Sequence, residues 1–150
     1  MGQSLVKNYV HITFSTKNRV PLISEEIEKE LYSYIGGICK NLECYPIKVG
    51  GFYDHVHILT SLSKKIALMV LLEKLKANSS KWIKTKSDSL KKFYWQNGYG
   101  AFSVNPFEID KVVSYIENQK EHHRKKTFQD EYRGFLKKYN VGYDEKYIWD

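Results

Sequence analysis

The sequence predicts an α+β fold, a ferredoxin-like (split β-α-β) antiparallel sheet with helices on one face and an extra C-terminal helix that carries Tyr115. The first observation is the order of the patterns along the chain. Period-2 and helical-period segments follow one another as β-α-β-β-α-β-α, which is the split βαβ order. The second is size: 150 residues can bury one core, and no linker, repeat or low-complexity tract divides them. We therefore expect a single domain over residues 1–150.

The first half of the chain is expected to hold three strands and one helix. Residues 9–15 alternate apolar and polar side chains, which is typical of a strand. Ser24 is expected to cap a helix, because three glutamates in its first turn would face the positive helix end. The apolar stripe of this helix consists of Ile27, Leu31, Tyr34, Ile35, Ile38 and Leu42. Residues 46–52 and 55–62 are predicted strands, joined by a turn at Tyr53-Asp54.

The second half is expected to hold a long helix, a strand and two further helices. The apolar residues that would turn the helix over 66–85 inward are Leu68, Leu71, Leu72, Leu75, Trp82 and Ile83. Residues 99–104 predict the fourth strand. Asn105-Pro106 predicts the start of a helix that extends to Lys126, since Pro suits the first turn. A short amphipathic helix is expected over 130–138.

The net charge of +7 is concentrated in one segment. Residues 64–92 hold nine lysines against Glu73 and Asp88, whereas the acidic and basic residues balance on either side. Such a segment indicates a polyanionic partner, although a solvated helix face explains it equally well. The candidates for phosphate contact in this segment are Lys74, Lys76 and Lys81. Arg19, in the loop after the first strand, is a weaker candidate.

The composition also bears on location and membrane association. The longest aliphatic run, residues 66–72, is far shorter than the roughly 20 residues that cross a bilayer, so no membrane partner is expected. Cys39 and Cys44 lack CxxC spacing and are too few for a disulfide framework. We expect reduced thiols in a cytoplasmic protein.

Two pairs of residues carry the candidate chemistry. His55 and His57 lie two positions apart in a predicted strand, so both side chains share a face and can chelate one divalent ion. This H-x-H pattern is weak by itself. Tyr115 and Gln119 lie four positions apart on a predicted helix and project from one side of it. Asp54 is either a turn residue, the commoner case, or a carboxylate that orients a ligating histidine.

Together these side chains favour metal-assisted attack on a phosphodiester. A metal ion can withdraw charge from a phosphate oxygen and orient the group. A tyrosine hydroxyl becomes a competent nucleophile near a cation, and its phosphoester conserves bond energy for a later rejoining step. The sequence contains no GxxxxGK[ST] phosphate loop, so a bound nucleotide is not expected.

Four segments resemble the single-tyrosine HUH transposases of small bacterial insertion sequences, in the order and with the spacing of that family. They are DHVHILTSL (54–62), KLKANSSKWI (74–83), WQNGYGAFSV (95–104) and YIENQKEHHR (115–124). The resemblance implies that His55, His57 and Gln119 bind Mg²⁺ or Mn²⁺. It implies that Tyr115 joins to a 5′-phosphate of single-stranded DNA. It also implies hairpin recognition at element ends, and a homodimer in which, for some members, one subunit completes the other's site.

Three other interpretations remain at this point. A non-catalytic single-stranded nucleic-acid-binding module could use the same sheet, and NGYGAFSV loosely echoes an RNA-recognition strand. That module would leave the two histidines and Gln119 without a role. A phosphoesterase with paired H-x-T motifs would need a second copy of His11-Ile12-Thr13, which the sequence lacks. A replication initiator of the HUH group usually carries two tyrosines on this helix, and only Tyr115 is present.

Overall fold

The structure, a computed structural model, describes residues 2–150, and its strands form one antiparallel sheet. The strands are β1 (Tyr9–Ser15), β2 (Pro46–Phe52), β3 (His55–Ser61) and β4 (Gly100–Val104). Their order across the sheet is β2-β3-β1-β4, and every neighbouring pair is antiparallel. With the element order β-α-β-β-α-β this is a ferredoxin-like sheet, so the predicted α+β class is confirmed.

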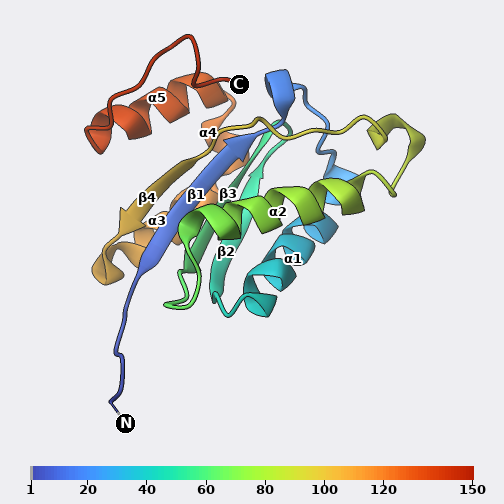
Figure 1. Ribbon diagram of the computed structural model, residues 1–150. Helices are drawn as coiled ribbons and strands as arrows, with labels where there is room; N and C mark the ends of the chain where they lie inside the picture. The colour runs from blue at the N-terminus through green and yellow to red at the C-terminus, as the bar shows by residue number, and fades with distance from the viewer. Residues whose placement is uncertain (1) are drawn as a thin grey trace.

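Helices lie on both sides of the sheet (Figure 1). They are α1 (Glu25–Asn41), α2 (Leu68–Ile83), α3 (Ile109–Glu117), α4 (Gln119–His122) and α5 (Phe128–Lys138). Short 3₁₀ turns lie at η1 (Lys17–Arg19), η2 (Asp88–Leu90) and η3 (Pro106–Glu108). The helix that was expected to run to Lys126 is interrupted, because Asn118 (φ −95°, ψ 19°) leaves helical geometry between α3 and α4.

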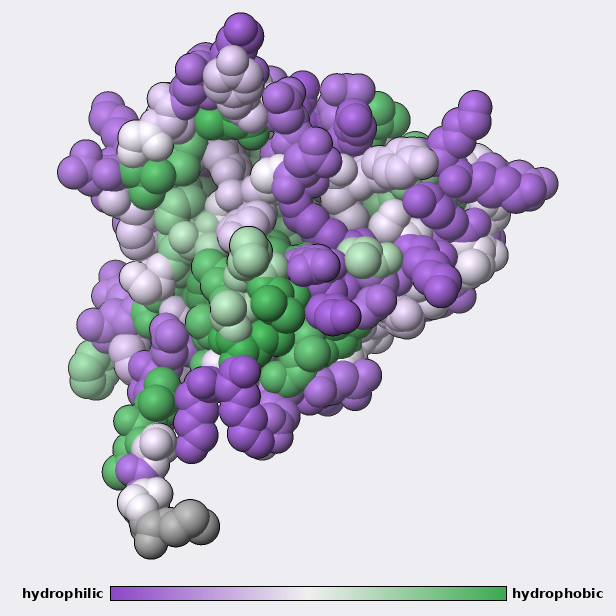
Figure 2. Space-filling model, in the orientation of Figure 1, coloured by the Kyte–Doolittle hydropathy of each residue, from purple (hydrophilic) through white to green (hydrophobic). Residues whose placement is uncertain are grey.

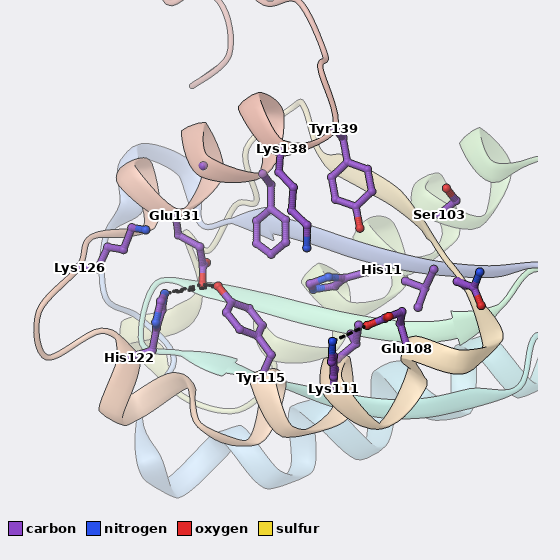
Figure 3. A pocket seen from close by; sticks show the side chains of 15 residues that line it. His11, Ser103, Glu108, Lys111, Tyr115, His122, Lys126, Glu131, Lys138 and Tyr139 are labelled. Atoms are coloured by element: carbon purple, nitrogen blue, oxygen red, sulfur yellow. Dashed lines mark hydrogen bonds and ion pairs between the residues drawn. The ribbon is translucent and has the colours of Figure 1, made fainter.

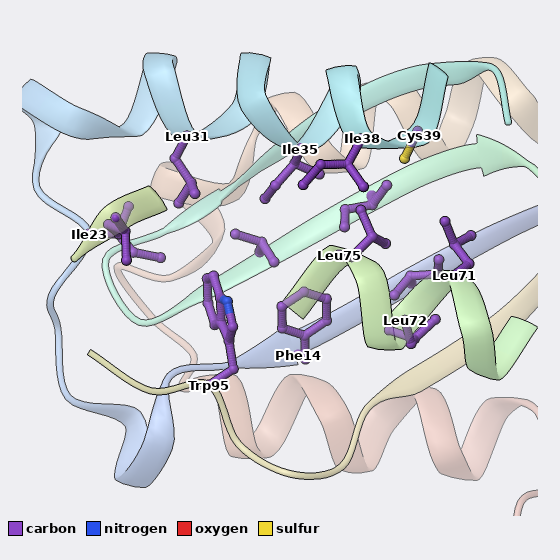
Figure 4. Close-up of a cluster of buried hydrophobic side chains, with 14 of the residues drawn as sticks. Phe14, Ile23, Leu31, Ile35, Ile38, Cys39, Leu71, Leu72, Leu75 and Trp95 are labelled. Atoms are coloured by element: carbon purple, nitrogen blue, oxygen red, sulfur yellow. The ribbon is translucent and has the colours of Figure 1, made fainter. Parts of the chain in front are cut away.

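The main core lies between one face of the sheet and helices α1 and α2 (Figure 4). Alternate residues of β1 and β3 point into it, and Ile12, Phe14, Val56 and Ile58 are fully buried. The facing helix residues include Leu31, Ile35, Leu71, Leu72 and Leu75. Since the side-chain period of a strand is two, the intervening residues, His55 and His57 among them, point to the opposite face.

Helix α3 packs on that opposite face. Ile116 joins Leu59 and Val104 in a separate apolar cluster there. Gly50 of β2 lies directly beneath the helix, and a Cβ atom at this position would come within 2.7 Å of the Ile116 Cγ2 atom. The glycine therefore allows α3 to approach the strand closely, and this approach sets the height of Tyr115 above the sheet.

Helix α5 is held by a second small cluster and by the C-terminal tail. Phe128, Tyr132 and Leu136 pack with Phe102 of β4. The Trp149 ring lies 5.8 Å from that of Tyr132, centroid to centroid, and its Nε1 donates to Glu145. The backbone carbonyl of Asp150 accepts from the Gly98 amide at 2.9 Å. The tail, for which the sequence predicted no role, thus connects α5 to the segment that enters β4.

The basic segment 64–92 is only partly helical. Helix α2 ends at Ile83, so the lysines from Lys84 onward lie in the segment that follows it. Figure 2 shows hydrophilic side chains gathered over that segment and a hydrophobic area over the first half of α2. Among residues 2–150, no helix has both the length and the apolar character needed to cross a membrane.

Lys76 has an internal role. Its ammonium group is half-buried and donates to the backbone carbonyls of Gln96 and Asn97, both at 2.9 Å, and to that of Gly98. Burial lowers its pKa to about 8, so the group remains charged at neutral pH. Lys76 therefore holds the segment before β4 against α2.

We expect Lys76→Met to lower the free energy of unfolding by about 2–3 kcal/mol, because charge-assisted hydrogen bonds to three carbonyls are lost. Lys74→Met is the matched control, since Lys74 is exposed on the same helix and should change stability by less than about 0.5 kcal/mol. Urea denaturation of both variants measures this. Equal losses in the two variants would show that Lys76 has no special structural role.

Candidate active site

Two buried imidazoles form the centre of the site. His55 and His57 project from β3 toward α3, and both side chains are 0 % exposed. Their ring centroids are 5.1 Å apart. The alternation of β3 thus brings the pair together as the sequence predicted, with Val56 directed into the main core between them.

Each imidazole has a partner on its Nδ1 atom. Nδ1 of His55 lies 2.7 Å from a carboxylate oxygen of Asp54, so the ring donates its proton there. The sequence left two roles open for Asp54, a turn residue or a carboxylate that orients a histidine, and this contact agrees with the second. Nδ1 of His57 lies 2.8 Å from Nε2 of His11. His11 belongs to β1, two positions before Thr13, the residue that pairs with His57 in the sheet. His11 therefore belongs to the site.

Tyr115 and Gln119 reach the same place from the helical side. Oε1 of Gln119 lies 2.9 Å from Nε2 of His55. The Tyr115 ring centroid lies 5.7 Å from that of His57. Tyr115 lies in the last turns of α3, and Gln119 begins α4 after the break at Asn118. One chain therefore brings together all four residues that the sequence singled out.

The structure adds two residues that the sequence analysis missed. Glu131 of α5 is only 3 % exposed, and its Oε1 lies 2.9 Å from Nε2 of His57. Its Oε2 accepts from the Tyr115 hydroxyl and, at 3.1 Å, from the Gln119 amide. Nε2 of His123 lies 3.2 Å from the same oxygen. The ligand atoms of His55, His57, His123 and Glu131 all lie within 4.8 Å of one another.

The electrostatics of the site follow from burial and from this carboxylate. Burial alone would raise the pKa of Glu131, but interactions with His57 and His123 hold it well below its usual range. Burial lowers the pKa of His57 despite the carboxylate beside it, and burial with the neighbouring His57 lowers that of His11 to about 3. Burial, then the charge of Glu131, raises the pKa of Tyr115. The phenol thus keeps its proton in this arrangement.

An open cleft of about 820 Å³ leads to the Tyr115 hydroxyl. Figure 3 shows Tyr115, His122 and Glu131 in contact at one end and His11 in the wall. The cationic side chains around the cleft are Lys111, Lys126 and Lys138. Phe135 and Tyr139 of the α5 region supply apolar surface. A chain of phosphates could reach the phenol along this cleft.

The predicted phosphate-contacting residues lie elsewhere. Lys74 and Lys81 are exposed on α2, on the face of the sheet opposite Tyr115. Arg19 is partly buried, with its guanidinium 5.5 Å from the centre of the Trp149 ring. Lys76 is committed to backbone carbonyls, as described above, so it leaves the set of candidate DNA contacts. The lysines of the cleft come from separate segments of the chain, so no single basic run in the sequence marks them as a group.

Comparison with protein families identifies the class. The family model described as "Transposase IS200 like" matches residues 4–119, which is most of the chain and includes His55, His57, Tyr115 and Gln119. The chain therefore belongs to this family of transposases, enzymes that process DNA. The resemblance seen in the sequence is confirmed.

Two solved structures share the fold. One is a protein from Deinococcus radiodurans R1 described as a transposase candidate, 20% identical, with a TM-score of 0.62 over 79% of this chain and 96% of that chain. The other is a REP-associated tyrosine transposase bound to a REP hairpin, 16% identical, with a TM-score of 0.60 over 82% of this chain and 73% of that chain. No curated protein matches the chain. At these identities the two structures support the fold alone.

Proposed function

We propose that this transposase cleaves and rejoins single-stranded DNA through a 5′-phosphotyrosine intermediate on Tyr115, with assistance from a divalent metal ion. The observation that carries the proposal is the convergence of Gln119, His55 and His57 on Tyr115, which lines an open cleft. We propose that the chain acts as one transposase domain.

The covalent step follows from the nucleophile. The Tyr115 oxygen forms a bond to phosphorus and loses its proton, while the bond from phosphorus to the 3′ oxygen breaks. The 3′ oxygen takes up a proton and leaves as a hydroxyl group. The new phosphoester is attacked by a later 3′ hydroxyl in the reverse sense, which rejoins the strand without a nucleotide cofactor. The cleft lysines Lys111, Lys126 and Lys138 would hold the phosphates in line with the phenol.

The donor set suits a divalent metal ion. In the neutral tautomer of His55 whose Nδ1 donates a hydrogen bond to Asp54, the Nε2 atom can bind a metal ion. This atom lies 2.9 Å from Oε1 of Gln119, a second possible ligand. We propose Mg²⁺ or Mn²⁺ held by His55, His57 and Gln119; when bound it would polarise a non-bridging phosphate oxygen.

Because the pKa of Tyr115 is raised, the phenol requires a nearby cation to become the nucleophilic phenolate. Burial and Glu131 favour its neutral form, so a cation nearby would shift the balance toward the phenolate. His11 and Asp54 would keep the ligating rings in fixed tautomers and orientations through their Nδ1 contacts.

We propose single-stranded DNA with hairpins at element ends as the partner. The REP-associated transposase with the same fold is bound to a REP hairpin, which supports this substrate class. We also propose a homodimer, although all four site residues described here come from one chain. A hairpin stem would lie against the exposed lysines of α2, and the strand to be cut would enter the cleft.

The experiment for this function uses single-stranded hairpin oligonucleotides, with Mn²⁺ or Mg²⁺ and with chelator. Denaturing gels should show a shortened DNA product and a protein band shifted by covalent DNA, both only with metal. The non-catalytic binding module would retard the DNA in native gels and give neither product.

We expect removal of the Lys74 and Lys81 side chains to reduce the salt dependence of hairpin binding. Each lysine that neutralises a phosphate contributes roughly 0.9 to the slope of log K against log salt, so the double Ala variant should lose about 2. Lys65→Ala is the control, since Lys65 is exposed and pairs with Glu43 at 3.0 Å. Fluorescence anisotropy over a salt series measures the slope. An unchanged slope would remove α2 from the DNA interface.

A further inference from the structure

A buried carboxylate that the sequence motif does not contain lies at the centre of the site. We infer that Glu131 is a fourth protein ligand of the metal ion, and that its second oxygen holds Tyr115 beside that ion. This inference rests on the proposed metal-assisted function and adds a residue from α5, which follows the segment matched by the family model.

The two oxygens of Glu131 have different surroundings. Oε2 receives donors: the Tyr115 hydroxyl, the Gln119 amide at 3.1 Å and the His123 ring at 3.2 Å. The His123 ring is also held by a second contact, because its Nδ1 lies 2.6 Å from the Lys126 carbonyl. Oε1 instead faces the histidine pair. Oε2 thus lies within hydrogen-bonding distance of three groups, whereas Oε1 is directed at the two histidines that are proposed metal ligands.

The distances around Oε1 are those of ligands that share one ion. It lies 2.9 Å from Nε2 of His57 and 3.4 Å from Nε2 of His55, which is itself 2.9 Å from Oε1 of Gln119. Two ligands at right angles, each about 2.1 Å from a metal ion, are separated by about 3.0 Å, and wider angles give slightly more. These three distances therefore match the spacing of ligands in one coordination sphere.

The charge of the site leads to the same assignment. Two neutral imidazoles and an amide carry no negative charge, whereas a divalent ion in a buried site requires compensation. Glu131 supplies it from a position that is 3 % exposed. A carboxylate oxygen also makes the set more suitable for Mg²⁺ or Mn²⁺, which prefer oxygen ligands. His123 contacts the outer oxygen, so we place it behind Glu131 as an orienting group.

The test is Mn²⁺ binding by calorimetry and by electron paramagnetic resonance of free Mn²⁺, without DNA. Glu131→Gln keeps the shape of the side chain and removes the charge. Its affinity should fall by more than the about 10–100-fold that loss of an outer partner costs. Asp130→Asn is the matched control, one residue earlier on the same helix but exposed, and should bind like the unaltered protein.

The outcomes separate the inference from the function on which it rests. If the unaltered protein binds no Mn²⁺, the metal half of the proposed function fails. If it binds and Glu131→Gln binds equally well, Glu131 is no ligand, even where the melting temperature of the metal-free protein changes. Should Glu131→Gln fail to fold, Glu131→Asp decides the question: the shortened carboxylate should weaken binding, and unchanged affinity would overturn the inference.

Discussion

Tyr115→Phe is expected to abolish the covalent protein–DNA product while the fold and Mn²⁺ binding remain. The substitution removes one oxygen atom, the proposed nucleophile. Loss of a nucleophile in enzymes that form covalent intermediates lowers the rate by about 10⁴-fold or more, because no other group takes its place. Glu131 keeps its contacts with Gln119 and His123 in this variant, so the site should stay assembled. Denaturing gels of hairpin oligonucleotide reactions, quantified over time, measure the loss.

Tyr139→Phe is the matched control for this prediction. Tyr139 lines the same cleft, but its ring stacks on Phe102 at a centroid distance of 4.8 Å. Its hydroxyl should be dispensable, with activity within a few-fold of the unaltered protein. Comparable losses in Tyr139→Phe and Tyr115→Phe would mean that the cleft matters and that Tyr115 is not the nucleophile.

His57→Ala should eliminate both metal binding and DNA cleavage. The imidazole is completely buried between His11 and Glu131, and its removal takes one ligand and leaves a cavity beside the carboxylate. We expect a larger effect than the about 10–100-fold that follows loss of an outer partner. Asp54→Asn, which weakens the anchor of His55, should fall within that smaller range.

The control for His57→Ala must disturb the same strands without removing a proposed ligand. Thr13→Val meets this need, because Thr13 pairs with His57 across β1 and β3 and its hydroxyl donates to the Val56 carbonyl at 2.8 Å. Calorimetric Mn²⁺ titration and cleavage assays of the three variants compare them. Normal cleavage by His57→Ala would contradict the metal site described here.

Much of the fold could be predicted because local patterns and tertiary packing agree. In β1, Val10, Ile12 and Phe14 alternate, and all three belong to the main core on one face of the sheet, as the period of two predicts. The break at Asn118 was not predictable in this way: residues 117–127 contain no apolar side chain, so no hydrophobic period marks where α3 ends and α4 begins.

The residues of the site fall into two groups: those that sequence periods predict and those that only tertiary packing brings in. His55 with His57, and Tyr115 with Gln119, are pairs set by strand and helix periods, so the sequence could nominate them. His11 joins them only through the antiparallel register of β1 and β3. Glu131 carried one readable signal. It lies on the apolar stripe of α5 with Phe128 and Tyr132, where a lone carboxylate must find partners. Which partners it finds depends on how α5 packs, and this information is tertiary.

The most direct test of the central claim is to map the covalent product by mass spectrometry. The protein is incubated with a single-stranded hairpin oligonucleotide and Mn²⁺, digested with nuclease and protease, and searched for nucleotide-bearing peptides. We predict a 5′-linked nucleotide on the peptide that contains Tyr115, formed only when metal is present. A nucleotide on any other of the 12 tyrosines, or strand cleavage without an adduct, would contradict the account.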